Sequence, residues 1–528
     1  MTFNSLQFFI FFPIVGLLYY LIPKKYQWVW LLVASYTFYL LANFKFGFFL
    51  ISTTVTTYYA AIAIGKKAEN QKSLLSENKG IYTKEQVKQL KETVKSQKKQ
   101  IIAAVLLLNF GILAFLKYFN FFMKSVDGLF STFHSSFHSP ALKLLLPLGI
   151  SFYTFQAMGY LIDVYRGKYP PEKNLGKFAL FLAFFPQIME GPIGRYNDLA
   201  HQLYEPRDFD YKNAKFGLQL MLWGYFKKVV IADRAGILVN MVYNNYQNFT
   251  GKQIAIAVVV YAVQIYADFS GYIDIATGAA QFLGIRLARN FDHPYFSKSV
   301  AEFWRRWHIT LGTWFKDYLF YPLSLSKFCM KLGKFSRKHF NSSFAKNVPA
   351  FFGLAIVWLT TGLWHGADWH YVLYGVYYGV LIILSMQCKP LFQKAYVSLH
   401  IQTESFGWRL FQVARTFFLV CIGFILFRAE NLGIAFSIMK SIFTFKRLPF
   451  HSSFISNDFT RTDIGILIIS ILVLAVISLL QRKRSLREAL AKQNTVLRWS
   501  VYCAAVLSIL FFGILASSDP TQFIYFQF

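Results

Sequence analysis

The chain has 528 residues, of which 55% are hydrophobic, 19% are aromatic and only 15% are charged, and its net charge is +30. A soluble globular chain carries roughly 25% charged residues. This composition and the recurring long apolar runs exclude an ordinary soluble protein and indicate one that crosses a membrane many times. The positive charge lies in short segments between apolar runs, which argues against nucleic acid as a partner and is typical of cytoplasmic loops.

The apolar runs predict an all-α, polytopic membrane protein of about 11–12 transmembrane helices, in one membrane domain over residues 1–528. A barrel is excluded because its strands alternate in polarity and run for only about 10 residues. The lipid bilayer is therefore the expected surroundings. In chain order, the predicted spans are residues 5–22, 26–42, 46–64, 101–122, 144–165, 212–232, 252–283, 348–363, 366–386, 407–427, 461–480 and 499–516.

Residues Met1 to Leu21 predict a retained first span, because no basic segment or small-residue cleavage site marks a cleaved signal. After three predicted crossings comes a basic segment, residues 66–100, with ten Lys and four Glu between Lys66 and Lys99. Its composition is helical, and its charge predicts a cytoplasmic loop, which places the N-terminus outside. Two further basic segments are residues 327–346 and 482–498. An acidic carrier protein or anionic lipid headgroups are secondary candidates for binding these positive loops.

Two segments, residues 176–205 and 295–325, do not fit simple spans. The first holds two prolines and two glycines close to Glu190 and Arg195. Irregular backbone of this kind is tolerated at membrane depth only when protein or a watery cavity surrounds it, so we expect a re-entrant or interfacial segment. The second mixes Trp and Arg at helical spacing around His308, which predicts an interfacial or shallow-funnel helix.

His365 lies in the middle of a long apolar, aromatic run. An ionisable side chain at membrane depth is costly and usually faces a cavity or a reaction path, and histidine exchanges a proton near neutral pH. The alternative is a packed histidine bonded to a neighbouring helix. His308, with Trp304 and Gly312 one helical turn to either side, is the second candidate. The two histidines either pair beside a narrow tunnel or are unrelated, and their spacing alone favours the second interpretation.

No metal site is predicted. His365 and His370 flank Asp368, but residues five apart on a helix point away from each other, unlike the pair of a zinc helix. The four cysteines show no paired spacing and suggest neither zinc nor a disulfide framework.

Asp268 and Asp274 are two carboxylates inside a predicted span. Six residues of helix turn through about 240°, so the two side chains do not form a pair. We expect structural bonds to buried backbone or to Arg286, although intramembrane carboxylates are also candidates for a proton relay.

Five internal motifs together match one family, and a C-terminal motif agrees with them. They are Phe185–Tyr196 (FPQIMEGPIGRY), Ala267–Ala276 (ADFSGYIDIA), Phe303–His308 (FWRRWH), Thr361–Gly366 (TGLWHG), Phe427–Glu430 (FRAE) and Phe523–Phe528 (FIYFQF). On these residues the chain resembles the membrane-bound O-acyltransferases over nearly its whole length. It looks closest to the bacterial branch that acetylates alginate or D-alanylates teichoic acids. One motif alone would be weak, whereas the set is highly specific.

The resemblance implies a ring of tilted helices around a thinned centre, crossed by a tunnel from a cytoplasmic funnel to the outer face. The motif-bearing core would be residues 176–325 and 348–386, with His365 as the catalytic residue and His308 as the second site residue. The donor would be an acyl thioester, acetyl-coenzyme A or the phosphopantetheine of an acyl carrier protein, and no cofactor would be bound permanently. Residues expected to line the tunnel or bind the donor are Trp304, Arg305, Trp364 and Asp317.

The predicted function is to move an acyl group, most simply acetyl, from a cytoplasmic thioester across a bacterial cell membrane to a cell-surface or secreted polysaccharide. His365 would act as general base on the acceptor hydroxyl, with an acyl-histidine as the alternative, and His308 would orient the donor or stabilise the oxyanion. Arg305 and Arg306 either attract the donor's phosphates or are ordinary cytoplasmic charge. The chain shows no serine hydrolase motif, so a separate extracytoplasmic transferase is the expected partner.

Alternative functions stay open from the sequence. The pattern Gln-x-x-x-Gly-Pro-Ile that begins at Gln187 and the chain length of 528 residues favour the polysaccharide-acetylating branch. Met189 and Glu190 depart from the apolar-small pair that is common in the family, which leaves the identity of the donor open. D-alanyl transfer from a carrier protein to teichoic acid is therefore the first alternative. A proton-coupled transporter is the second, although no repeated halves are visible. A structural scaffold would give no reason for the histidine motifs.

Overall fold

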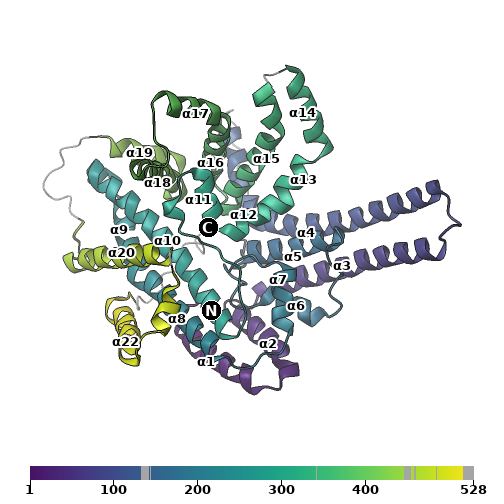
Figure 1. Cartoon of the computed structure of the whole chain (residues 1–528), viewed down its shortest axis with the longest axis horizontal. Helices are drawn as coiled ribbons and strands as arrows, with labels where there is room; N and C mark the ends of the chain where they lie inside the picture. The colour runs from purple at the N-terminus through teal and green to yellow at the C-terminus, as the bar shows by residue number, and fades with distance from the viewer. Residues whose placement is uncertain are drawn as a thin grey trace. The chain divides into compact units, whose positions relative to one another are not determined.

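The computed structural model describes residues 1–132, 142, 144–339, 342–444, 454–456, 459–482 and 484–514. Every regular element in these ranges is a helix, which confirms the predicted all-α class (Figure 1). The chain divides into two compact units, Met1–Gly217 with Ala279–Ala288, and Leu218–Gly278 with Arg289–Phe528. A single domain over residues 1–528 stays a prediction. The C-terminal motif Phe523–Phe528 lies outside the described residues.

The first unit is built from seven helices and the ends of two more. They are α1 (Leu6–Leu21), α2 (Gln27–Leu40), α3 (Phe46–Glu77), α4 (Lys84–Thr132), α5 (Ile150–Tyr165), α6 (Leu175–Ala183) and α7 (Tyr196–Tyr204), with the first part of α8 (Tyr211–Tyr225) and the last part of α10 (Gly251–Phe282). Within this unit α3 packs against α4 and α5, and α2 packs against α6.

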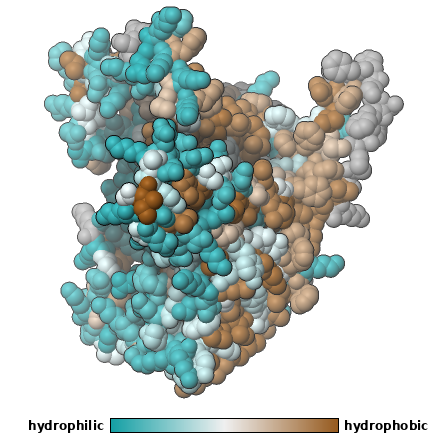
Figure 2. All heavy atoms as spheres, turned by 90° about the vertical axis from the view of Figure 1, so that its right-hand side faces the viewer, coloured by the Kyte–Doolittle hydropathy of each residue, from teal (hydrophilic) through white to brown (hydrophobic). Residues whose placement is uncertain are grey.

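The predicted basic loop is the far end of a long helical hairpin rather than a separate segment. The helix α3 continues its apolar span to Glu77, and α4 begins at Lys84, so both spans run on into the Lys-rich residues (Figure 1). Thr83 and Gln86 exchange hydrogen bonds of 2.9 and 3.2 Å between side chains and backbone N–H groups, which is a capping box at the start of α4. Hydrophilic side chains cover most of the tip that points at the viewer in Figure 2, around a small hydrophobic patch.

The Phe185–Tyr196 motif follows the last residue of α6 and is non-helical until α7. Its residues from Phe185 to Ile193 are almost all buried by the protein. Gln187 holds the turn together, because its side-chain amide donates to Gln156 Oε1 at 3.2 Å and to the carbonyl of Pro192. The broken, protein-enclosed backbone agrees with the expectation for this segment.

Eight helices in the described ranges are long and apolar enough to span a membrane. They are α3, α4, α10, α15 (Ser342–His365), α16 (Trp369–Gln387), α18 (Phe406–Arg428), α20 (Arg461–Gln481) and α22 (Thr495–Phe512), each at the place of a predicted span. Three of the other four predicted spans coincide with α1, α2 and α5, which have only 14 to 16 residues and fall short of the roughly 20 residues that cross a bilayer upright. The fourth, residues 212–232, is helical throughout, because α8 runs without a break into the π-helical turn Phe226–Ala232.

The second unit carries the histidine motifs. Besides the parts of α8 and α10 and the long helices named above, it contains the π-helical turns η2 (Phe226–Ala232) and η5 (Lys316–Phe320), the short turns η3 (Tyr246–Asn248) and η4 (Pro294–Phe296), and α9 (Asp233–Asn244), α11 (Val300–Arg306), α12 (Ile309–Phe315), α13 (Tyr321–Ser324), α14 (Lys327–His339), α17 (Lys389–Ser398), α19 (Leu432–Ile442) and α21 (Leu486–Ala491). Here α16 packs between α15 and α18.

The helices α15 and α16 approach closely because two glycines face each other. A Cβ atom at Gly375 would lie 3.0 Å from the Cα of Gly362 and nearer still to the carbonyl oxygen of Trp358. Small residues at such crossings let membrane helices pack backbone to backbone. The crossing lies within one turn of His365, so it sets the position of the candidate catalytic residue.

We expect Gly375→Ala to destabilise the protein by about 1–3 kcal/mol, the usual effect of overpacking a close contact. The added methyl group would push α15 and α16 apart, so acyl transfer should fall together with the thermal unfolding midpoint measured in detergent. Gly465→Ala is the matched control, because Gly465 is helical and a Cβ there meets nothing within 4 Å. Equal midpoints for the two variants would contradict the close packing.

Candidate active site

His365 is the last residue of α15 and is buried in an aromatic cage. Three rings meet it at steep angles: Trp364 at 4.9 Å, Phe427 at 5.2 Å and Tyr374 at 5.5 Å between centroids. Tyr374 belongs to α16 and Phe427 to α18, so three spanning helices position this side chain. An apolar wall of this kind excludes water and strengthens every polar interaction inside it.

The segment around His308 is not the continuous helix that its spacing predicts. The helix α11 ends at Arg306 and α12 begins at Ile309, and His308 between them has φ 47° and ψ 52°. This left-handed conformation costs a residue other than glycine roughly 1–2 kcal/mol. Strained residues of this kind cluster at functional sites. Trp304 and Gly312 are therefore not one turn away from His308 on a shared helix face, although the backbone oxygen of Trp304 still lies 3.8 Å from a Cβ placed on Gly312.

Asn290 holds the break in place. Its backbone oxygen accepts from Ile309 N at 3.0 Å, and its side-chain oxygen accepts from Thr310 N at 3.1 Å and Thr310 Oγ1 at 2.9 Å. The first N–H groups of a helix have no partners within the helix, and here Asn290 satisfies two of them. The same side-chain oxygen lies 3.3 Å from Nδ1 of His308.

This arrangement determines which tautomer His308 adopts. Burial lowers the pKa of His308 to about 3, so the imidazole is neutral near pH 7. The Thr310 N–H can only donate, so the Asn290 atom that faces it is the oxygen. That oxygen can only accept, which makes Nδ1 of His308 the protonated nitrogen and leaves Nε2 as the acceptor.

One indole ring links the two histidines. Trp364 lies 4.9 Å from the ring of His365 and 5.6 Å from the ring of His308. Phe269, from the Ala267–Ala276 motif on α10, packs edge-on against His308 at 4.9 Å. The two histidines therefore lie close together in the fold, because they share an aromatic neighbour although they are far apart in the sequence. That they act as a pair beside a tunnel stays a prediction.

Trp304 joins the same aromatic cluster from α11. Its ring meets Trp358 and Tyr378, each at 4.9 Å, and Tyr374 at 6.2 Å. Tyr374 in turn contacts His365. Trp304 and Trp364 thus both belong to the wall around the histidines.

The other two predicted donor-binding residues, Arg305 and Asp317, are charged and are not part of this aromatic cluster. Arg305 is exposed on α11, and Asp317 is half-buried on η5. Arg306 pairs with Glu302 at 2.6 Å, which leaves Arg305 as the better candidate for a phosphate. Roles for Arg305 and Asp317 in donor binding stay predictions.

His370 has a carboxylate partner. Its Nδ1 lies 3.1 Å from Asp368, whose side chain also caps α16. No group of three or more His, Cys, Asp or Glu in the described residues could hold a metal ion.

The two carboxylates of α10 bind lysines rather than Arg286. Lys228 lies 2.7 Å from Asp268 and 2.9 Å from Asp233. A structural bond was expected for Asp268 and is present, but its partner is Lys228 and not Arg286.

Lys227 binds the second of these carboxylates. It lies 2.7 Å from Asp274 and donates to Ser270 at 2.8 Å. Both lysines are almost fully buried on the π-helical turn η2. They reach α10 because a Cβ at Gly224 would lie only 2.7 Å from the carbonyl of Gly271, so the two helices cross there without side chains. Paired charges of this kind argue for a structural role rather than a proton relay.

The sequence-based prediction of site residues missed Tyr374, Phe269, Phe427 and Asn290. Phe269 and Phe427 stand inside quoted motifs, and that membership was the one signal that could have pointed to them. Asn290 carries no signal at all, because only the fold brings it to His308 from 18 residues away.

The family follows from a comparison with known proteins. The model described as MBOAT, membrane-bound O-acyltransferase family, matches residues 98–427. The chain belongs to the membrane-bound O-acyltransferase family. It is therefore a multi-pass membrane enzyme, an O-acyltransferase, and both histidines lie within the matched range.

Three relatives of this O-acyltransferase differ in what their names describe. It is 34% identical to a probable alginate O-acetylase AlgI of Pseudomonas syringae pv. tomato, over 84% of this chain and 76% of the relative. It is 27% identical to a peptidoglycan O-acetyltransferase of Helicobacter pylori, over 100% of this chain and 98% of the relative. It is 27% identical to a teichoic acid D-alanyltransferase of Bacillus subtilis, over 56% of this chain and 72% of the relative.

We expect Asn290→Asp to make acyl transfer by this O-acyltransferase sensitive to acid. The new carboxylate can still accept from Thr310, but a negative charge next to His308 moves the pKa of that histidine upward by roughly 1 to 3. Protonation then removes the Nε2 acceptor as the pH falls towards 5, whereas the wild-type His308, with a pKa of about 3, stays neutral. The measurement is the pH–rate profile.

Thr310→Val is the control for this prediction, because it removes one hydrogen bond to Asn290 and leaves the contact with His308. Its pH profile should match that of the wild type even if its stability falls. A profile for Asn290→Asp that superimposes on the wild type would show that Asn290 only caps α12.

Proposed function

We propose that this O-acyltransferase moves an acetyl group from a cytoplasmic thioester across the bacterial cell membrane for O-acetylation of a cell-surface or secreted polysaccharide. The observation that carries the proposal is the placing of His365 and His308 against one indole ring, inside an apolar cage of spanning helices. The alginate O-acetylase and peptidoglycan O-acetyltransferase relatives support an acetyl group and a glycan acceptor, since each covers most or all of the chain.

In the proposed reaction, His365 accepts the proton of an acceptor hydroxyl. The hydroxyl oxygen attacks the carbonyl carbon of the thioester, the C–S bond breaks, and the thiol leaves with a proton returned by the imidazolium. A general base of this kind contributes roughly 10²–10⁴-fold to the rate. An acyl-histidine intermediate is the alternative, in which the His365 nitrogen attacks first.

The geometry of His308 favours a different role from oxyanion stabilisation, which needs a hydrogen-bond donor. With Nδ1–H directed to Asn290, the nitrogen offered by His308 is an acceptor. We propose that His308 accepts a hydrogen bond from the acceptor hydroxyl or from a donor amide and so orients the substrate. Trp304 and Trp364 would form the wall along which the acyl chain reaches the histidines.

The proposed donor is acetyl-coenzyme A or an acetylated carrier protein, with Arg305 as a candidate contact for its phosphates. An extracytoplasmic acetyltransferase would be the partner that receives the group, or the glycan would receive it directly. D-alanyl transfer is less well supported, because the teichoic acid D-alanyltransferase relative covers only 56% of the chain.

The test uses purified protein in proteoliposomes, with radiolabelled acetyl-coenzyme A on one side and acceptor glycan on the other. We expect label to reach alginate or peptidoglycan fragments, alone or with an extracytoplasmic transferase added. Transfer of D-alanine from its carrier protein, without any transfer of acetyl, would overturn the acetyl donor and leave the family assignment intact.

A further inference from the structure

An apolar groove with a volume of about 850 Å³ opens in the second unit. A volume of this size is typical of the pockets that bind small molecules. Its walls come from α8 with η2, from α20 and from α22. Side chains that represent the three walls are Leu222, Trp223, Phe226, Ile469, Val473 and Val501. The described residues that line this groove include none of the candidate active-site residues.

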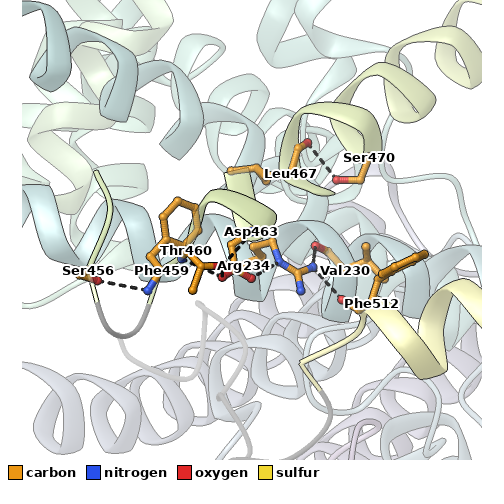
Figure 3. A network of polar contacts seen from close by, with 9 residues as sticks. All are labelled: Val230, Arg234, Ser456, Phe459, Thr460, Asp463, Leu467, Ser470 and Phe512. Atoms are coloured by element: carbon orange, nitrogen blue, oxygen red, sulfur yellow. Dashed lines mark hydrogen bonds and ion pairs between the residues drawn. The ribbon is translucent and has the colours of Figure 1, made fainter. Parts of the chain in front are cut away.

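Arg234 joins the three walls at one end of the groove (Figure 3). Its guanidinium donates to Asp463 Oδ1 at 3.0 Å on α20, to the carbonyl of Phe512 at 2.6 Å on α22, and to the carbonyl of Val230 at 3.2 Å on η2. Asp463 is also the third helical residue of the capping box that begins α20. The spacing of the groove walls is therefore fixed by the protein, since the buried Arg234 binds all three of them.

The opposite end of the groove is basic. The helices α20 and α22 are joined there by α21, about one span of roughly 30 Å from Arg234. Arg484 and Arg487 line the groove at this end, beside the amides of Gln481 and Gln493. The negative charges of Asp274 and Glu488 attract the guanidinium of Arg487 and offset part of its positive charge. Arg484, by contrast, is exposed.

The walls face outward rather than into the protein core. In the spanning windows of α20 and α22, 17% and 0% of the residues are buried. The connection between these helices carries several Lys and Arg residues, which indicates that it lies in the cytoplasm. An apolar groove one bilayer leaflet or more in length, with arginines at its cytoplasmic end, matches a molecule that has acyl chains and an anionic headgroup.

We propose that this groove binds an anionic phospholipid, with its acyl chains along α20 and α22 and its phosphate at Arg484 and Arg487. The proposal is independent of the acyl-transfer chemistry. Bidentate geometry makes arginine well suited to phosphate. The bound lipid would fill the space between the three walls, α8 with η2, α20 and α22.

The test measures quenching of Trp223 fluorescence by brominated acyl chains in nanodiscs of phosphatidylcholine. Brominated phosphatidylglycerol is titrated into one set and brominated phosphatidylcholine into another. The difference between the wild type and Trp223→Phe isolates the groove tryptophan. We expect phosphatidylglycerol to quench it at a lower mole fraction than phosphatidylcholine does.

The double variant Arg484→Gln with Arg487→Gln should abolish that preference, since each arginine contributes about fivefold to binding of an anionic lipid. Lys492→Gln is the matched control, because it removes one charge from the same connection but does not line the groove. Equal quenching by the two lipids in the wild type would overturn the proposal. So would quenching that appears only after residues 515–528 are removed, because the chain's own C-terminal segment would then be the occupant.

Discussion

His365→Ala should reduce acyl transfer by roughly 10²–10⁴-fold, the contribution of a positioned general base. The variant removes the imidazole from its cage of Trp364, Tyr374 and Phe427. The indole and phenyl rings of that cage cannot accept a proton, and a phenol stays protonated near neutral pH, so none of the three can replace the imidazole as a base. The measurement is the initial rate of label transfer from the thioester in proteoliposomes.

The matched control is His370→Gln, because His370 is the neighbouring buried histidine on α16 and is paired with Asp368. We expect this control to keep most of the activity and to show any loss that comes only from repacking. If His365→Ala retained wild-type rates, or if both variants lost activity equally with lowered unfolding midpoints, the catalytic assignment of His365 would be wrong. Trapping a labelled acyl-imidazole on wild-type protein would select the acyl-histidine route.

Lys228→Met should have the largest effect on stability, about 3–5 kcal/mol of destabilisation. Lys228 is 1% exposed and neutralises both Asp268 and Asp233. Removal of the ammonium group takes this shared counter-charge away from two buried carboxylates, which is costly because the site has a low dielectric constant. The measurement is the free energy of unfolding in mixed detergent micelles.

Lys24→Met is the matched control, since Lys24 also lies close to a carboxylate, 2.6 Å from Asp208, but both side chains are more than half exposed. An exposed pair contributes only about 0–1 kcal/mol. Adding Asp268→Asn to Lys228→Met should recover part of the loss, because one buried negative charge disappears. A loss as small for Lys228→Met as for Lys24→Met would show that water reaches the lysine.

Local patterns account for most of the fold that could be predicted. Long apolar runs are sufficient to place α3, α4, α10, α15 and the four later spans, since a lipid-exposed helix must be apolar along its whole length. The break after α6 was also predictable, because proline and glycine disfavour the continuation of a helix. The helical spacing around His308 predicted a continuous helix, but the helix breaks there at a left-handed residue. Asn290 makes the break possible by accepting hydrogen bonds from the first N–H groups of α12, and spacing does not reveal that contact.

The sequence by itself determined the all-α membrane class, the broken motif segment, and the two histidines worth testing, because hydropathy and residue type act locally. Only the tertiary structure decided that His365 and His308 share Trp364, that Asn290 directs the tautomer of His308, and that Asp268 and Asp274 bind separate lysines. Those contacts join residues that are distant in the sequence, and such side chains become neighbours only when helices pack. The same reason hides the groove, since its walls come from α8 in the middle of the chain and from α20 and α22 near its end.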